Sequence, residues 1–164
     1  MIIDIETLGL TPIEEKIICI GIKDIEEDRI NVLYGDDERL ILSLFWSNMI
    51  GVDKIVTYNG NNFDIPFIIM RSIINGVKIT VDIKDKLLDL RNICNSFSIS
   101  YEKYTKGKLS NWAKILNFTT KTENGEYMKD FYNSKEWNKI IEHCKEDISV
   151  TQLLYDRLVD VGLI

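Results

Sequence analysis

The clustering of β-strand patterns at the start of the chain is the feature that most limits how it can fold. Residues 1–6 form a short apolar run, and residues 16–22 form a second run rich in β-branched side chains. Residues 29–34 alternate apolar and polar side chains with a period of two, as strands do. The acidic segment at residues 24–28 is typical of a turn. Because strands joined this closely usually pair, we predict an antiparallel meander of three strands.

Helix and strand patterns alternate through the rest of the chain. Apolar side chains spaced three and four apart predict a helix over residues 37–49, and residues 54–58 return to a strand pattern. A second helix is predicted over residues 63–74, with Pro66 near its start and Gly76 closing it. Further helices are predicted over residues 109–116 and from 133 to about 161. The last helix is expected to begin at Asn133, because Asn133 and Glu136 have the spacing of a capping box. Residues 77–90 mix helix and strand signals, and residues 119–125 are typical of a polar loop.

The order of these elements predicts an α/β fold. A meander followed by alternating helices and strands gives a mixed β-sheet, in which three antiparallel strands are joined by parallel strands and flanked by helices. A chain of 164 residues is the size of one domain, so we expect residues 1–164 to fold as a single unit.

Composition and charge narrow the class of protein. The net charge of −6 argues against tight non-specific binding to nucleic acid, although carboxylates clustered at a metal site would contribute to it. The most apolar stretch, residues 40–52, is interrupted by polar side chains and falls short of the ~20 apolar residues that span a membrane. The chain begins without a signal-like apolar segment, and its three cysteines are widely spaced. We therefore expect a cytoplasmic protein with reduced thiols and without membrane association or zinc-dependent or thiol-dependent chemistry.

Two acidic residues stand close together on the first predicted strand. Asp4 and Glu6 are two residues apart, so both side chains point to the same face of the strand. Their mutual repulsion would be relieved by a hard divalent cation such as Mg²⁺ or Mn²⁺, which prefers carboxylate oxygens. A solvated strand end is the alternative, since the same tripeptide recurs at residues 24–26 in the predicted turn.

Two further acids lie where either a functional site or an ordinary helix would place them. Asp64 follows the Asn59-Gly60 turn at the start of a predicted helix, where a carboxylate stabilises free amides and the helix dipole. His143 is the only histidine, and it lies four residues before Asp147, so both side chains share one helix face. A solvated helix face would show the same spacing.

Together these segments resemble the motifs of the DEDD 3′–5′ exonucleases, which have an RNase H-like fold. Residues 4–7, DIET, match the first motif of that family. Residues 58–68, YNGNNFDIPFI, resemble the second motif as it occurs in the exonuclease domains of family B DNA polymerases. Residues 143–154, HCKEDISVTQLL, resemble the third, and residues 108–118, KLSNWAKILNF, are similar to a segment that precedes it. The resemblance runs from about residue 2 to residue 158.

The resemblance implies a metal-dependent exonuclease that hydrolyses phosphodiester bonds at the 3′ ends of single-stranded DNA or RNA, with DNA favoured. Two divalent metal ions, Mg²⁺ or Mn²⁺, would be the cofactors. The implied metal-site carboxylates are Asp4, Glu6, Asp64 and Asp147, with Asp4 between the two ions and Asp64 acting mainly through water.

The same resemblance makes His143 the candidate general base, as a neutral imidazole with a pKa near 6.5. The family has either a tyrosine four residues before the third-motif aspartate or a histidine five residues before it. His143 lies four residues before Asp147, so its position fits neither branch and does not assign the subclass.

Five residues near these motifs are candidates for binding the substrate: Thr7, Leu10, Tyr58, Asn59 and Phe63. Leu10 resembles the family's apolar wedge beside the 3′-terminal base, and packing in a loop or the core is the alternative. Tyr58 and Phe63 are candidates for stacking on the terminal nucleotide, because stacking on an aromatic ring accepts any base. Core packing of at least one of the two is the alternative.

A basic and aromatic segment at residues 101–121 suits a single strand. It holds five lysines against one acid, and Tyr101, Tyr104 and Trp112 are interleaved with them. Phosphate attraction and base stacking would act together there, so we predict that Lys103, Lys106 and Lys108 bind substrate. In the alternative, the segment is an exposed loop followed by a helix that buries Trp112.

Two other functions stay open at this point. An exoribonuclease that trims RNA 3′ ends is the alternative within the enzyme class. A catalytically silent nuclease-fold module that binds nucleic acid is the alternative outside it. The four acids argue against a silent module, because a buried cluster of like charges costs stability without metal.

Overall fold

A mixed five-stranded sheet forms the centre of the molecule, in the strand order β3-β2-β1-β4-β5. The computed structural model describes residues 1–99, 107–119 and 127–164. The first three strands pair antiparallel, and the last two continue the sheet parallel to β1: β1 (Ile2–Thr7), β2 (Ile17–Lys23), β3 (Ile30–Tyr34), β4 (Ile55–Thr57) and β5 (Leu87–Asp89). The predicted meander and mixed α/β sheet are confirmed, and the single-domain organisation stays a prediction.

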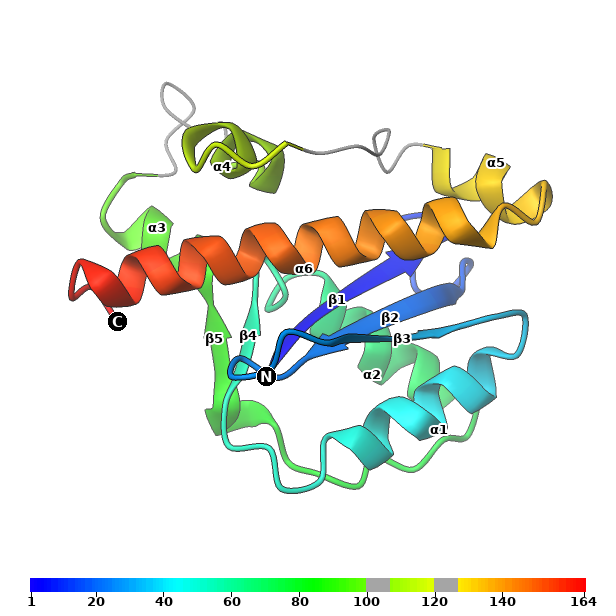
Figure 1. The fold of residues 1–164 in the computed structure, drawn as a ribbon. Coiled ribbons are helices and arrows are strands. Elements are labelled where there is room, and N and C mark those ends of the chain that lie inside the picture. Colours follow the sequence, from blue (N-terminus) through cyan, green and yellow to red (C-terminus); the bar gives the residue numbers. More distant parts are fainter. Residues whose placement is uncertain (100–106, 120–126) are drawn as a thin grey trace.

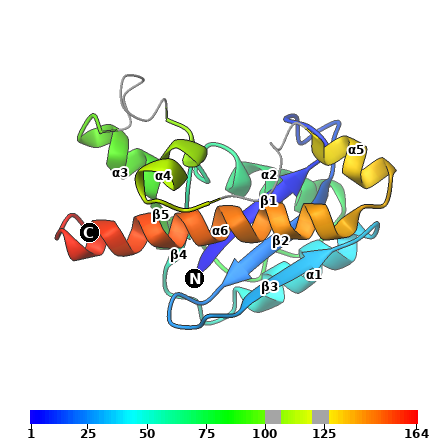
Figure 2. The ribbon, with the colours of Figure 1, turned by 45° about the horizontal axis from the view of Figure 1, so that its top comes forward.

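The helices lie on both faces of this sheet (Figures 1 and 2). They are α1 (Glu38–Asn48), α2 (Asp64–Ile74), α3 (Leu90–Ser96), α4 (Leu109–Ile115), α5 (Met128–Asn133) and α6 (Trp137–Asp160), with a 3₁₀ turn, η1 (Lys84–Lys86), before β5. The long helix α6 crosses one face together with α3, α4 and α5, and α1 and α2 cover the other. Helices therefore cover both faces of the sheet.

The alternation along β1 decides which face receives the acidic residues. Ile3 and Ile5 are buried against α1 and α2 on one face of the sheet. Ile2 is buried in the core beneath α6 on the other face. Because side chains alternate along a strand, Asp4 and Glu6 point to the same side as Ile2, toward α6. The acids thus face a covering helix rather than an open strand end.

Local signals set the start of α1 and the end of α2. The side chain of Asp37 accepts a hydrogen bond of 3.0 Å from the amide of Leu40 and caps α1. Gly76 follows α2 with a φ of +62°, a conformation that glycine adopts without strain.

The predicted start of the final helix at Asn133 is wrong. Asn133 is the last residue of α5, and α6 begins at Trp137. Between them Lys135 has a φ of +57°, which breaks the helical path. Burial of Met128 and Phe131 in the core beneath α6 gives α5 its own packing surface.

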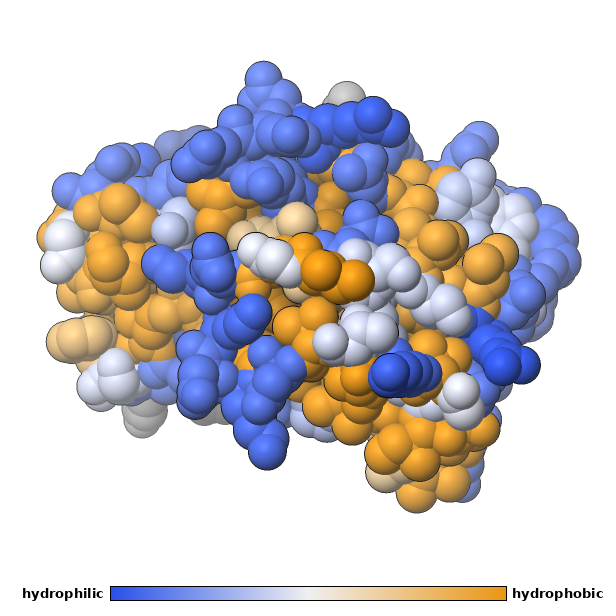
Figure 3. Space-filling view, turned by 90° about the horizontal axis from the view of Figure 1, so that it is seen from below, coloured by the Kyte–Doolittle hydropathy of each residue, from blue (hydrophilic) through white to orange (hydrophobic). Residues whose placement is uncertain are grey.

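The outer side of α1 and α2 mixes apolar and polar surface (Figure 3). Its exposed apolar residues are Leu40, Leu44, Ile50, Ile73, Ile74 and Ile79. Across the described parts of the chain, no helix combines the length and the apolar character that crossing a membrane requires.

Candidate metal and substrate site

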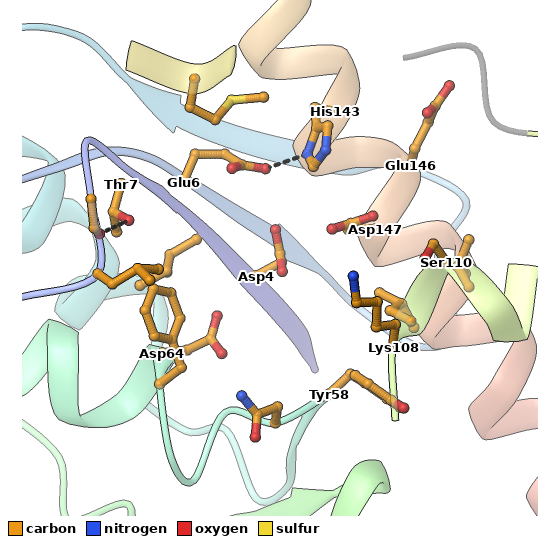
Figure 4. Close-up of a pocket in the computed structure, with 18 of the residues that line it drawn as sticks. Asp4, Glu6, Thr7, Tyr58, Asp64, Lys108, Ser110, His143, Glu146 and Asp147 are labelled. Carbon is orange, nitrogen blue, oxygen red and sulfur yellow. Dashed lines mark hydrogen bonds and ion pairs between the residues drawn. The ribbon is translucent and has the colours of Figure 1, made fainter. Parts of the chain in front are cut away.

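A pocket of about 740 Å³ opens beside β1, at the start of α2 and the middle of α6 (Figure 4). All four predicted carboxylates line it: Asp4, Glu6, Asp64 and Asp147. It is also lined by His143 and by the predicted substrate-binding residues Thr7, Leu10, Tyr58, Asn59, Phe63 and Lys108. Lys103 and Lys106 lie outside the described residues, as do Tyr101 and Tyr104. Segments far apart in sequence therefore meet at one cavity.

Close packing of α6 on the sheet brings the third motif over the first. Gly21 on β2 is the register partner of Asp4. A Cβ atom at Gly21 would collide with the side chain of Ile148 and lie 2.6 Å from Cys144 Sγ. The absence of a side chain at Gly21 is what lets α6 approach this closely, so Gly21 places His143 and Asp147 above the acids of β1.

His143 and Glu6 form the shortest link between β1 and α6 within the pocket. His143 Nδ1 lies 2.7 Å from Glu6 Oε1, and both side chains are largely buried. Burial of the imidazole lowers its pKa, but the hydrogen bond to Glu6 and the charges of Glu6 and Asp147 outweigh burial and raise the pKa of His143 to about 9. In the metal-free protein Glu6 therefore stabilises the imidazolium, and the neutral imidazole expected for the metal-bound reaction stays a prediction.

Mutual repulsion marks the carboxylates around Asp4. Burial, followed by the negative charges of Asp147, Glu6 and Asp64, raises the pKa of Asp4 well above its usual range. Burial also raises the pKa of Asp147 to about 6, although His143 acts in the opposite direction. Asp4 Oδ2 is buried and finds no hydrogen-bond partner among the described residues. A buried oxygen without a donor, next to other acids, fits the ligand set of a hard divalent cation.

The ligand atoms fall into two overlapping groups. Glu6, His143 and Asp147 place one ligand atom each within 4.8 Å of one another, and so do Asp4, Glu6 and Cys144. Asp64 belongs to neither group in the described part of the chain. It lies across the pocket, where burial raises its pKa to about 7 while backbone amides, including that of Ile5, hydrogen-bond to it. Asp64 is thus the outlying member of the four.

Cys144 is a poor ligand despite its position. A hydrogen bond with Cys19, followed by burial, raises the pKa of the Cys144 thiol well above its usual range. The thiol therefore stays protonated, whereas metals bind the thiolate, and hard cations prefer the carboxylate oxygens beside it.

Three apolar side chains that were candidates for contacting the substrate differ in how deeply they are buried. Leu10 is 83% exposed at the pocket edge, which excludes core packing for it. Phe63 is half-buried, and its ring lies 5.5 Å from that of Phe67, so it both packs on the core and reaches the pocket. Trp112 is buried in the core cluster to which α6 also contributes, so the expectation that it stacks on a single strand is wrong. The apolar face of α4 packs inward and takes Trp112 with it.

Several contributors to the pocket were missed in the sequence. Met128 and Lys129 line it from α5, and Ser110 and Glu146 line it from α4 and α6. The spacing of Met128 and Phe131, three residues apart, was the available signal for a short helix. Without a long period behind it, that signal did not stand out from a loop.

The fold and the pocket define an α/β protein with clustered carboxylates on a mixed sheet. The model of the RNase H superfamily matches residues 1–159, so the chain belongs to that superfamily. Membership supports a nuclease that acts on nucleic acid, and RNase H-like nucleases generally use divalent metal ions, in keeping with the acidic cluster.

Two similar proteins add to this assignment. An uncharacterized protein of Methanocaldococcus jannaschii is 35% identical over 175 residues, which cover 99% of this chain and 97% of that protein. The solved structure of the family B DNA polymerase from the hyperthermophilic archaeon Pyrobaculum calidifontis matches with a TM-score of 0.80 at 18% identity. That match covers 99% of this chain and 24% of the polymerase chain, so it shows a shared fold over about a quarter of the polymerase. The predicted RNase H-like fold is confirmed.

Proposed function

We propose that this protein is a metal-dependent 3′–5′ exonuclease that hydrolyses phosphodiester bonds at the 3′ ends of single-stranded nucleic acid, with DNA favoured. The observation that carries the proposal is the convergence of Asp4, Glu6, Asp64 and Asp147 on one pocket. Burial and mutual repulsion raise the pKa of three of them, so the cluster is costly unless cations neutralise it.

The four carboxylates would hold two divalent cations, Mg²⁺ or Mn²⁺. When bound, such cations neutralise charge on the phosphate and make the attacking water more acidic. Asp4, whose unpartnered oxygen is central to the cluster, would face both ions. Asp64, outside both close ligand groups, would act mainly through water.

His143 would orient the attacking water or take its proton. Nδ1 is engaged by Glu6, so Nε2 is the ring nitrogen left for water. Imidazole accepts a proton only in its neutral form, so this role requires that the charge of Glu6 be neutralised first. The pairing otherwise holds the ring in place, as carboxylates do for catalytic histidines.

The remaining pocket residues would bind the terminal nucleotides. Tyr58 and Phe63 line the pocket and would stack on the terminal bases, and Leu10, which is exposed at its edge, would wedge beside a terminal base. Thr7 donates a hydrogen bond of 2.6 Å to the carbonyl of Gly9, which ties the Leu10 loop back to β1. Lys108 supplies a positive charge for phosphate.

The decisive experiment is degradation of end-labelled oligonucleotides. Matched single-stranded DNA and RNA, labelled at the 5′ end, are incubated with Mg²⁺, Mn²⁺ or a chelator. A ladder that shortens from the 3′ end only with metal supports the proposal, and the relative rates distinguish DNA exonuclease from exoribonuclease. Intact oligonucleotides under every condition exclude both.

The silent binding module is separated from the enzyme by metal binding. Titration calorimetry with Mn²⁺ should show saturable binding that Asp4→Asn abolishes, because Asp4 is central to the acidic cluster. A silent module should bind the ion weakly.

The three buried free thiols are in keeping with the cytoplasmic location expected from the sequence.

A further inference from the structure

The loop that carries Tyr58 and Asn59 is held by a buried acid outside the pocket. Asp89, at the end of β5, is 3% exposed. One of its oxygens accepts hydrogen bonds from the amides of Asn59 at 2.9 Å and Arg91 at 3.0 Å, and the other accepts one from the amide of Asn61 at 3.0 Å. A carboxylate bonded to three backbone amides fixes the path of the loop that leads to Asp64.

Arg91 extends this attachment to the side chain of Asn59. Arg91 Nη1 donates a hydrogen bond of 2.8 Å to Asn59 Oδ1. Asn59 has a φ of +70°, a conformation that is uncommon for residues other than glycine. The backbone bond to Asp89 and the side-chain bond to Arg91 together hold Asn59 in that conformation, facing the pocket.

The same guanidinium also lies close to a second segment of the chain, at Gly107. A Cβ atom at Gly107 would lie 3.1 Å from Arg91 Nη2, so the backbone at Gly107 passes closely over Arg91. Gly107 immediately precedes Lys108, which lines the pocket and lies on the same side of it as Tyr58 in Figure 4. Arg91 therefore spans two segments that are far apart in sequence and that both form the pocket wall.

We propose that Arg91 is a positioning residue that holds Asn59, and with it the wall of Tyr58 and Lys108, in the arrangement that receives the 3′-terminal nucleotides. The inference rests on the proposed function, and it adds a residue that does not itself line the pocket. Arg91 contacts none of the four metal-site carboxylates, so it should act on substrate binding rather than on the chemical step.

The test compares steady-state kinetics of Arg91→Ala with those of Lys86→Ala. Lys86 is also half-buried and also donates to an oxygen of another segment, the carbonyl of Val52, but it lies at the other end of β5. Both variants lose one positive charge. Loss of a charge-assisted hydrogen bond should raise KM about tenfold in Arg91→Ala, with kcat within about twofold. Lys86→Ala should leave KM unchanged, and equal KM values in the two variants overturn the inference.

A double-mutant cycle tests whether Arg91 acts through Asn59. Asn59→Gly removes the side-chain acceptor and tolerates the positive φ. The KM effect of Arg91→Ala should be smaller in the Asn59→Gly background than in the native one, and Arg91→Lys, which can still donate to Asn59, should recover part of the native KM. An Arg91→Ala effect that is as large in both backgrounds overturns the inference. Melting temperatures identify any variant that fails to fold.

Failure of the proposed function gives a separate result. If the native protein degrades no oligonucleotide, the nuclease proposal falls, and dissociation constants for a fluorescent single strand replace KM in the same comparison. If the native protein is active and Arg91→Ala matches Lys86→Ala, the positioning role alone falls.

Discussion

Glu6 on β1 and His143 on α6 meet across the pocket, with 2.7 Å between Oε1 and Nδ1. The residue proposed to bind metal and the residue proposed to handle the proton are therefore directly coupled. His143→Ala should reduce cleavage by about 10²- to 10⁴-fold, the usual contribution of a general base. Single-turnover cleavage measures the effect, and Mn²⁺ calorimetry checks that the metal site survives.

His143→Gln is the matched control for this prediction. Glutamine retains a donor toward Glu6 but cannot take a proton at neutral pH, so it should be as slow as alanine. If His143→Ala keeps the native rate, His143 has no part in the reaction.

Asp4→Asn should abolish cleavage while making the metal-free protein more stable. The pKa of the Asp4 carboxyl is raised by burial and by three neighbouring acids, so removing its charge relieves repulsion. In chelator at pH 8, the Asp4→Asn variant should melt at a higher temperature than the native protein. Its free energy of unfolding should be larger by on the order of 1 kcal/mol. Saturating Mn²⁺ should raise the melting temperature of the native protein and not of Asp4→Asn. A variant less stable than native in chelator would contradict this account.

The sequence alone predicted the features that depend on short spacings between residues along the chain. The two-residue spacing of Asp4 and Glu6 placed them on one face, and the four-residue spacing of His143 and Asp147 placed both at the pocket. The meander followed from short connections, which leave few other pairings. These features depend on neighbours along the chain, and such neighbours can be read from sequence.

What the sequence could not provide depends on contacts between distant segments. The raised pKa of His143 requires Glu6, which is 137 positions away. The burial of Trp112 depends on where α6 lies, and the role of Gly21 depends on how closely α6 approaches. A local pattern contains none of these distances.

Leu10→Ala should weaken activity on duplex ends more than on single strands. Leu10 is 83% exposed, so its loss should change the free energy of unfolding by less than about 0.5 kcal/mol. A wedge beside the terminal base matters most when that base must be unpaired. The ratio of rates on blunt duplex and single strand measures this. Ile13→Ala is the control, because Ile13 is 69% exposed in the same connection and does not line the pocket. Equal ratios for the two variants would remove the wedge role.

Lys108→Ala should weaken binding of single strands and flatten its dependence on salt. Removing one lysine that neutralises a phosphate lowers the slope of log K against log salt by about 0.7 for a single strand. Lys114→Ala is the matched control, since Lys114 is exposed on α4 and lies outside the pocket lining. Fluorescence anisotropy between low and moderate salt gives both slopes. An unchanged slope in Lys108→Ala would show that this lysine binds no phosphate.

Stability of the metal-free protein should fall as pH rises. The folded pKa of Asp64 is about 7 and that of Asp147 about 6, against 3.8 for an ordinary aspartate. The folded protein therefore binds more protons than the unfolded chain between these values, so the free energy of unfolding decreases from about pH 4 to pH 7. His143 extends the decrease, because its folded pKa of about 9 exceeds the ordinary 6.5. Melting temperatures in chelator at pH 5, 7 and 9 should decline in that order.

Two controls test the cause of this decline. Asp64→Asn should make the decline in melting temperature between pH 5 and 7 smaller. Saturating Mn²⁺ should oppose the decline most at high pH, where the carboxylates are ionised. A melting temperature that rises with pH in chelator would mean that burial and repulsion do not raise the pKa of these acids in the folded protein.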